Sequence, residues 1–119
     1  MTIKSTPNQT PRIYRVRNIT QQEEERILDF LQGAVYLWCK DRPADWFGLR
    51  DFMGGANKNW HGTALQGLYD RHAVTMSPAD SSRRAAIDGG RLLKRVLHAD
   101  AREFEARKGY RTAEYRMLP

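Results

Sequence analysis

The chain has 119 residues and a formal net charge of +6, with 40% hydrophobic and 10% aromatic residues. This hydrophobic content excludes a wholly disordered chain, and the length suits one domain better than two. The longest uncharged apolar run, residues 31–39, is too short to cross a bilayer, and the N-terminal residues lack the apolar centre of a secretory signal. The single Cys39 cannot form an internal disulfide, which suits a reducing compartment. We therefore expect a cytoplasmic protein.

The positive charge is concentrated at the two ends of the chain. Residues 1–17 carry a net charge of +4 and residues 81–119 carry +5, whereas residues 18–80 carry −3. If folding brings the two ends to one surface, that surface attracts a polyanion. A solubilising surface charge with no partner is the alternative explanation.

The N-terminal part predicts a tail followed by a short strand. Residues 1–11 contain proline and small polar residues without apolar periodicity, so we expect a flexible tail, with residues 12–119 forming a single domain. Residues 12–17 alternate between basic and apolar side chains, which predicts a strand.

A long helix is expected next, beginning after Thr20 and ending near Asp41. Thr20 and Glu23 match a capping box, and Pro43 prevents the helix from continuing. Its apolar residues recur at three- and four-residue spacing and predict a stripe that packs into the core: Ile27, Phe30, Leu31, Ala34, Val35 and Trp38.

Two further helical segments are predicted in the middle of the chain. Asp45 is a plausible N-cap for a short helix over residues 46–53, and residues 60–72 have apolar side chains at helical spacing. The aromatic residues of this region have the spacing of core residues, and a platform for stacking nucleic-acid bases is the alternative: Trp46, Phe47, Phe52 and Trp60.

The segment 83–99 combines helical periodicity with five basic residues and one Asp. Ser77 as N-cap and Pro78 at the first helical position predict a helix over residues 78–98, although Gly89 and Gly90 weaken its interior. At about 100° per residue, one side of this helix is apolar and the opposite side is basic, with Asp88 and Ile87 as exceptions on the basic side. The basic side contains Arg83, Arg84, Arg91, Lys94, Arg95 and His98.

The C-terminal segment changes to a period of two, which predicts strands over residues 102–107 and 110–117. The tip of this hairpin carries Arg107, Lys108 and Arg111. A helix over residues 100–108 is the competing interpretation, because DARE also resembles a capping box. Together these elements predict an α+β fold, mainly α, in which a helical bundle is joined by a C-terminal β-hairpin and a short N-terminal strand.

This order of elements resembles the winged helix-turn-helix superfamily. The resemblance rests on RRAAIDGGRLLKRVLHAD followed by FEARKGYRTAEYRML and covers roughly residues 45–118. It implies a winged-helix-like domain in which the last helix enters the major groove and the hairpin lies against the DNA backbone or an adjacent minor groove. The segment 71–80 is longer than a tight helix-turn-helix connection, and residues 60–72 offer a rival helix. Charge favours the later helix as the one that reads DNA.

The sequence therefore predicts a nucleic-acid-binding module, with duplex DNA favoured over RNA and transcription regulation as a role that would follow. The alternative is a small adaptor or inhibitor that places the same basic face on an acidic protein. The resemblance also makes a homodimer through the first long helix reasonable, because winged-helix proteins often read two half-sites. No enzyme motif, metal-ligand spacing or cofactor motif is present in the sequence, and we expect no membrane partner. The expected nucleic-acid-binding residues are Arg83, Arg84, Arg91, Lys94, Arg95, Arg107, Lys108 and Arg111.

Overall fold

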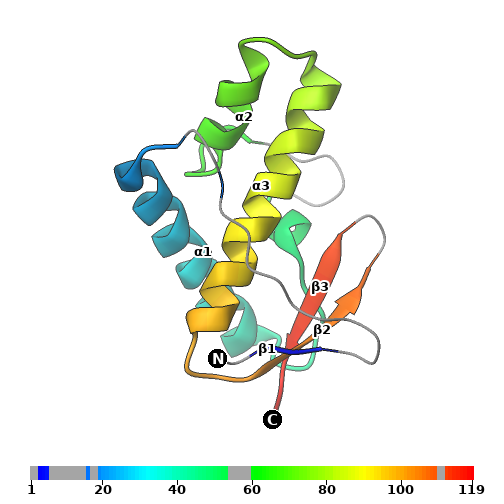
Figure 1. The fold of residues 1–119 in the computed structure, drawn as a ribbon. Helices are drawn as coiled ribbons and strands as arrows, with labels where there is room; N and C mark the ends of the chain where they lie inside the picture. The colour runs from blue at the N-terminus through cyan, green and yellow to red at the C-terminus, as the bar shows by residue number, and fades with distance from the viewer. Residues whose placement is uncertain (1–2, 6–15, 17–18, 54–59, 110–111) are drawn as a thin grey trace.

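The computed structural model describes residues 3–5, 16, 19–53, 60–109 and 112–119, and it has an α+β architecture that is mainly helical (Figure 1). The predicted strand at residues 12–17 lies almost entirely outside this part of the chain. A strand is found nearer the N-terminus, within the segment assigned to a tail. In chain order the elements are β1 (Ile3–Ser5), α1 (Gln21–Asp41), the 3₁₀ helix η1 (Leu49–Phe52), α2 (Gln66–Ala73), α3 (Pro78–Ala99), β2 (Phe104–Lys108) and β3 (Ala113–Met117).

Helix α1 has the predicted bounds. The Thr20 hydroxyl accepts a hydrogen bond from the Glu23 backbone N–H at 3.1 Å, which caps the first turn. Its core-facing side includes Cys39, whose burial raises the pKa of the thiol. The buried residues of the helix are Ile27, Leu31, Val35 and Cys39.

The predicted helix over residues 46–53 is wrong in its first half. The Phe47 N–H donates to the Tyr115 carbonyl at 2.8 Å, and the Tyr115 N–H donates to the Phe47 carbonyl at 2.7 Å. A backbone that pairs with a strand in this way is extended and cannot be helical. Only the four residues of η1 remain helical, and Phe47 itself is fully buried.

The helix predicted over residues 60–72 forms only in its second half, as α2. Trp60 precedes it and is buried, with its indole N–H donating to the Ser82 hydroxyl at 3.2 Å. The Trp60 ring also stacks on Tyr69 with the centroids 6.1 Å apart. Both aromatic rings therefore belong to the packing between the α2 region and α3.

Helix α3 runs through the predicted span without a break, and Gly89 in its interior has a packing role. Ser77 caps the helix by accepting from the Asp80 N–H at 3.2 Å. A Cβ atom at Gly89 would lie 2.6 Å from the Leu49 Cδ2 atom, so η1 packs against the bare backbone of α3. At Gly90 a Cβ atom would meet nothing within 4 Å.

These two adjacent glycines give a matched pair of variants. Gly90→Ala should raise the free energy of unfolding by about 0.5–1 kcal/mol, because alanine favours the helix and space is open. Gly89→Ala should be at least about 1 kcal/mol less stable than Gly90→Ala, because the buried Leu49 must move. Urea unfolding followed by circular dichroism measures both, and equal stability of the two variants would contradict the packing of η1 on Gly89.

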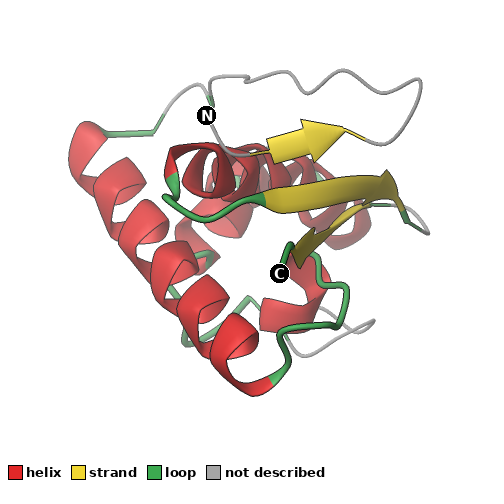
Figure 2. Ribbon diagram, turned by 90° about the horizontal axis from the view of Figure 1, so that it is seen from below, coloured by secondary structure: helices red, strands yellow, loops and turns green. Residues whose placement is uncertain are grey.

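The hairpin is confirmed, and the competing helix over residues 100–108 is wrong. Strand β2 pairs with β3 in antiparallel register, with Phe104 opposite Met117 and Ala106 opposite Tyr115. Strand β1 pairs with β2 in parallel, which gives the strand order β1-β2-β3. In Figure 1, α3 lies between α1 and the hairpin, and Figure 2 shows α1 and the three strands on different sides of it.

Asp100 fixes the junction between α3 and β2. One of its oxygens accepts from the Arg102 N–H at 2.8 Å, and the other accepts from the Gln32 side-chain amide of α1 at 2.9 Å. The Arg102 guanidinium closes an ion pair with the same carboxylate at 2.8 Å. The hydrogen bonds from Arg102, the strongest cause, and from Gln32 lower the pKa of Asp100 from 3.8 to about 2 despite burial. The Asp100 backbone is extended, so α3 ends here, and the carboxylate holds the turn that follows by accepting from Arg102.

Because of Asp100, the free energy of unfolding should depend on pH in acidic solution. A carboxyl group whose pKa is lower in the folded state stabilises the protein above its unfolded pKa of 3.8 and loses that contribution as the pH falls towards 2. The shift corresponds to about 2 kcal/mol. Asp100→Asn should therefore be less stable than the wild type by about this amount at pH 6, and the difference should shrink between pH 5 and pH 2. Thermal unfolding at a series of pH values tests this, and a difference that stays constant with pH would rule it out.

Candidate nucleic-acid interface

Helix α3 packs on its neighbours through one side. This buried side is turned about the helix axis relative to the apolar side that the sequence predicts. The buried residues include Asp88 and Gly89 as well as the expected leucines. Ile87, by contrast, keeps 47% of its surface exposed. The centre of the solvent-facing side is therefore Ile87 and its neighbours. The buried residues of α3 are Ser81, Ala85, Asp88, Gly89, Leu92, Leu93, Val96 and Leu97.

Asp88 does not interrupt the basic face, which corrects the expectation from the sequence. Its carboxylate accepts from the Arg71 guanidinium, and it lies 2.8 Å from the His72 Nε2 atom. The side chains of all three residues are at most one-fifth exposed. The last turn of α2 thus supplies the partners that allow an acidic residue to lie in the interface between α2 and α3.

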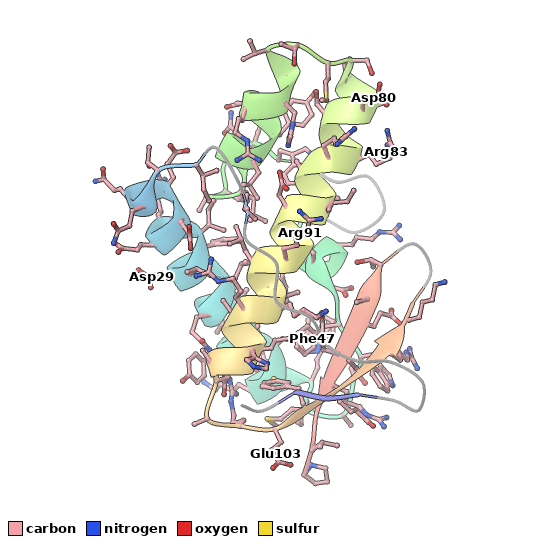
Figure 3. The ribbon with its side chains drawn as sticks, viewed as in Figure 1. Asp29, Phe47, Asp80, Arg83, Arg91 and Glu103 are labelled. Atoms are coloured by element: carbon pink, nitrogen blue, oxygen red, sulfur yellow. The ribbon has the colours of Figure 1, made fainter. Side chains whose placement is uncertain are left out.

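The solvent-facing side of α3 is rich in cations. The Arg83 side chain is 68% exposed, Arg84 is exposed, and Arg91 and Lys94 are partly exposed. Figure 3 shows Arg83 and Arg91 along the helix, with Asp80 near its first turn. Asp80 is the one acidic residue on this side, and it lies 3.5 Å from Arg83.

Arg95 occupies the edge of this face and is engaged with α1. Its guanidinium donates to the Glu24 carboxylate, and the two side chains are 30% and 25% exposed. The sequence placed Arg95 at the centre of the basic side because residues four apart share a helix face. The rotation of α3 brings it against α1 instead, where it links the two helices.

The hairpin contributes cations that are mostly compensated within the sheet. Arg107 donates to the Glu114 carboxylate at 2.9 Å across the strands, and its guanidinium lies 4.0 Å from the centre of the Trp46 ring. The Arg116 guanidinium lies 4.5 Å from the same ring and pairs with the Glu105 carboxylate.

The remaining basic residues of the hairpin tip are Lys108 and Arg111. Lys108 is exposed at the end of β2. Arg111 lies outside the described residues, so of the three predicted tip residues the structure places Arg107 and Lys108. Among the described residues of the tip, Lys108 therefore offers the less compensated charge, because Arg107 is held by Glu114.

Trp46 forms part of the hairpin surface, which the sequence does not predict. The sequence assigned it to the core, whereas its ring is half-buried beneath the two arginines of β2 and β3. Its position next to Phe47 in the sequence is the one feature that indicates an outward orientation. Once Phe47 points inward from an extended segment, its neighbour points outward by the alternation of a strand.

The connection between α2 and α3 is shorter than the sequence indicated. Helix α2 ends at Ala73 and α3 begins at Pro78, which leaves the four residues 74–77. A turn of three or four residues is the usual length in a helix-turn-helix pair. Three helices followed by a two-stranded antiparallel hairpin are compatible with a winged-helix-like architecture.

Comparisons with protein-family models, with curated proteins and with solved structures find no match to this chain. No helix in the described part of the chain is long and apolar enough to cross a membrane. Among the described residues, no group of three or more His, Cys, Asp or Glu side chains is arranged to hold a metal ion.

A double-mutant cycle should show that Arg95 contributes to the free energy of unfolding through Glu24, whereas an exposed arginine of α3 contributes little. Arg95→Ala should lower the free energy of unfolding by up to about 1 kcal/mol, and most of this cost should vanish when Glu24 is already alanine. Arg84→Ala should change stability by less than about 0.5 kcal/mol, because no described residue forms an ion pair with it. Additive costs for Arg95→Ala and Glu24→Ala in urea unfolding would show that the pair contributes nothing.

Proposed function

We propose that this protein binds nucleic acid, duplex DNA first, through the solvent-facing side of α3. The observation that carries the proposal is the sorting of charge on this helix. Both of its acidic residues are accounted for, since Asp88 is turned inward to Arg71 and His72 and Asp80 lies beside Arg83. The outer side beyond the first turn is consequently cationic over several turns, as a phosphate backbone requires.

The arrangement around α3 supports this role. The other side of the helix is held by α1, α2 and η1, so the cationic side is presented on a rigid element. Helix α2 is the weaker candidate for reading DNA, because its two basic residues, Arg71 and His72, contact Asp88. We infer that α3 takes the place of the recognition helix of a winged-helix domain and that Lys108, at the end of β2, contacts the backbone.

The residues of this face are suited to different contacts. Arg83 and Arg84 lie near the start of α3 and can reach phosphates or a guanine edge with two donors each. Lys94 supplies a point charge about three turns further along. Ile87, between them, supplies an apolar surface that can meet a thymine methyl group.

A second function uses the same face on an acidic protein. The exposed Ile87 favours this alternative, because an apolar side chain in a ring of cations adds to a protein contact and nothing to a phosphate contact. A role as an adaptor or inhibitor would then replace transcription regulation.

Fluorescence anisotropy with a labelled random-sequence duplex across a salt series tests the first function. The variant Arg83→Ala/Arg84→Ala should bind about tenfold or more weakly, and the slope of log K against log salt should fall by about 2, one for each lost phosphate contact. The matched control is Arg26→Ala/Arg42→Ala, which removes the same charge from exposed positions in and just after α1.

Three outcomes are distinct. A loss confined to the α3 variant supports the proposal, whereas equal losses in both variants mean that only net charge matters. No binding by the wild type at low salt overturns the DNA function and leaves the acidic protein as the partner to seek. A structured RNA hairpin in a parallel titration decides which nucleic acid is preferred.

A further inference from the structure

The outer side of α1 is the least explained surface of the described structure. Tyr36 and Leu37 are 57% and 65% exposed, and they are two of the four large hydrophobic residues exposed in the described chain. Neighbouring exposed apolar side chains on one helix face are unusual for a surface with no partner. In the helical repeat, Asp29, Gly33 and Lys40 lie on the same side, and all three are exposed.

This stripe is complementary to itself when two copies run antiparallel. A two-fold axis that crosses the helix between residues 34 and 35 places Gly33 of each copy opposite Tyr36 and Leu37 of the other. The same axis places Asp29 of each copy opposite Lys40 of the other. A parallel arrangement would instead bring equal charges together, so the charges specify the antiparallel one.

Gly33 supplies the space that such a contact needs. A Cβ atom at this position would meet nothing within 4 Å, so the space beside the helix backbone is open here. Glycine weakens a helix interior, and no packing contact among the described residues requires a glycine at this position. A bulky side chain from a second copy can approach the backbone at Gly33, between the side chains of Asp29 and Leu37.

The ring of Tyr36 is already oriented for the contact. The Arg102 guanidinium lies 4.4 Å from its centre and is itself fixed by Asp100. One side of the ring is therefore covered, and the rest of the side chain extends to solvent. Ordering a preorganised side chain costs little on association.

We propose that the stripe formed by Asp29, Gly33, Tyr36, Leu37 and Lys40 is the contact surface of an antiparallel homodimer. Figure 3 shows Asp29 on the side of α1 that faces away from α3, so the dimer leaves the cationic side of α3 open. A single pair of crossed helices buries less surface than a standard stable interface, and the dimer should accordingly be weak, in the micromolar range. This proposal does not depend on nucleic-acid binding.

Sedimentation equilibrium of the full chain over a wide range of concentrations tests the proposal. The wild-type mass should rise from 13.8 kDa towards twice that value. Leu37→Glu should remain monomeric, because it places a charge in the apolar contact with Gly33 of the partner. As residue 37 is exposed, circular dichroism should show an unchanged fold.

Charge reversal identifies the register. Asp29→Lys and Lys40→Asp should each weaken the dimer at least about tenfold, because symmetry introduces each repulsion twice. The double variant Asp29→Lys/Lys40→Asp should restore dimerisation, because opposite charges again face each other. Asp70→Lys, an equal charge change on an exposed position of α2, is the control and should leave the dimer unchanged.

Two results would overturn the proposal. One is a wild-type protein that remains monomeric at the highest concentration reached. The other is a dimer that the single charge reversals do not weaken, or whose formation the double variant does not restore. Either result would mean that the interface lies elsewhere or in another register.

Discussion

The backbone pairing of Phe47 with Tyr115 joins the segment between α1 and η1 to the hairpin. It extends the chain just before η1 and directs the Phe47 ring into the core, where Trp38, Phe52, Phe104 and Tyr115 surround it at centroid distances of 5.7–6.3 Å. Residues from α1, η1, β2 and β3 thus share one aromatic cluster. Burial of the Tyr115 phenol in this cluster raises its pKa to about 12, so its hydroxyl stays neutral.

Helix η1 packs against the side of α3 that contains Gly89, and the rotation of α3 determines which of its charges face the solvent. Leu49 packs on the bare backbone at Gly89, which only glycine permits at this separation. With Gly89 inward, its neighbour Asp88 is also inward, and α2 provides Arg71 and His72 for it. Arg95 turns to Glu24 of α1. The cationic side that remains is smaller than the sequence suggested and is free of acidic residues beyond Asp80.

Two surfaces of opposite character result, one on each of the two long helices. The side of α3 that faces solvent is cationic around an exposed Ile87, whereas the outer side of α1 carries apolar residues between one acid and one base. The hairpin, which the sequence predicts as a basic extension, instead holds Arg107 and Arg116 in cross-strand ion pairs over Trp46. Its contribution to any polyanion contact in the described part of the chain therefore depends mainly on Lys108.

The sequence by itself determined the features that arise from neighbouring residues. Capping by Thr20 and Ser77 set the starts of α1 and α3, and the change from helical to alternating periodicity identified the hairpin, because these signals act within a few residues. Tertiary structure alone decided the extended backbone at Phe47, the burial of Asp88 and the pairing of Arg95. Each of these depends on a partner between 16 and 71 residues away, and no local pattern specifies which residues the folded chain brings together.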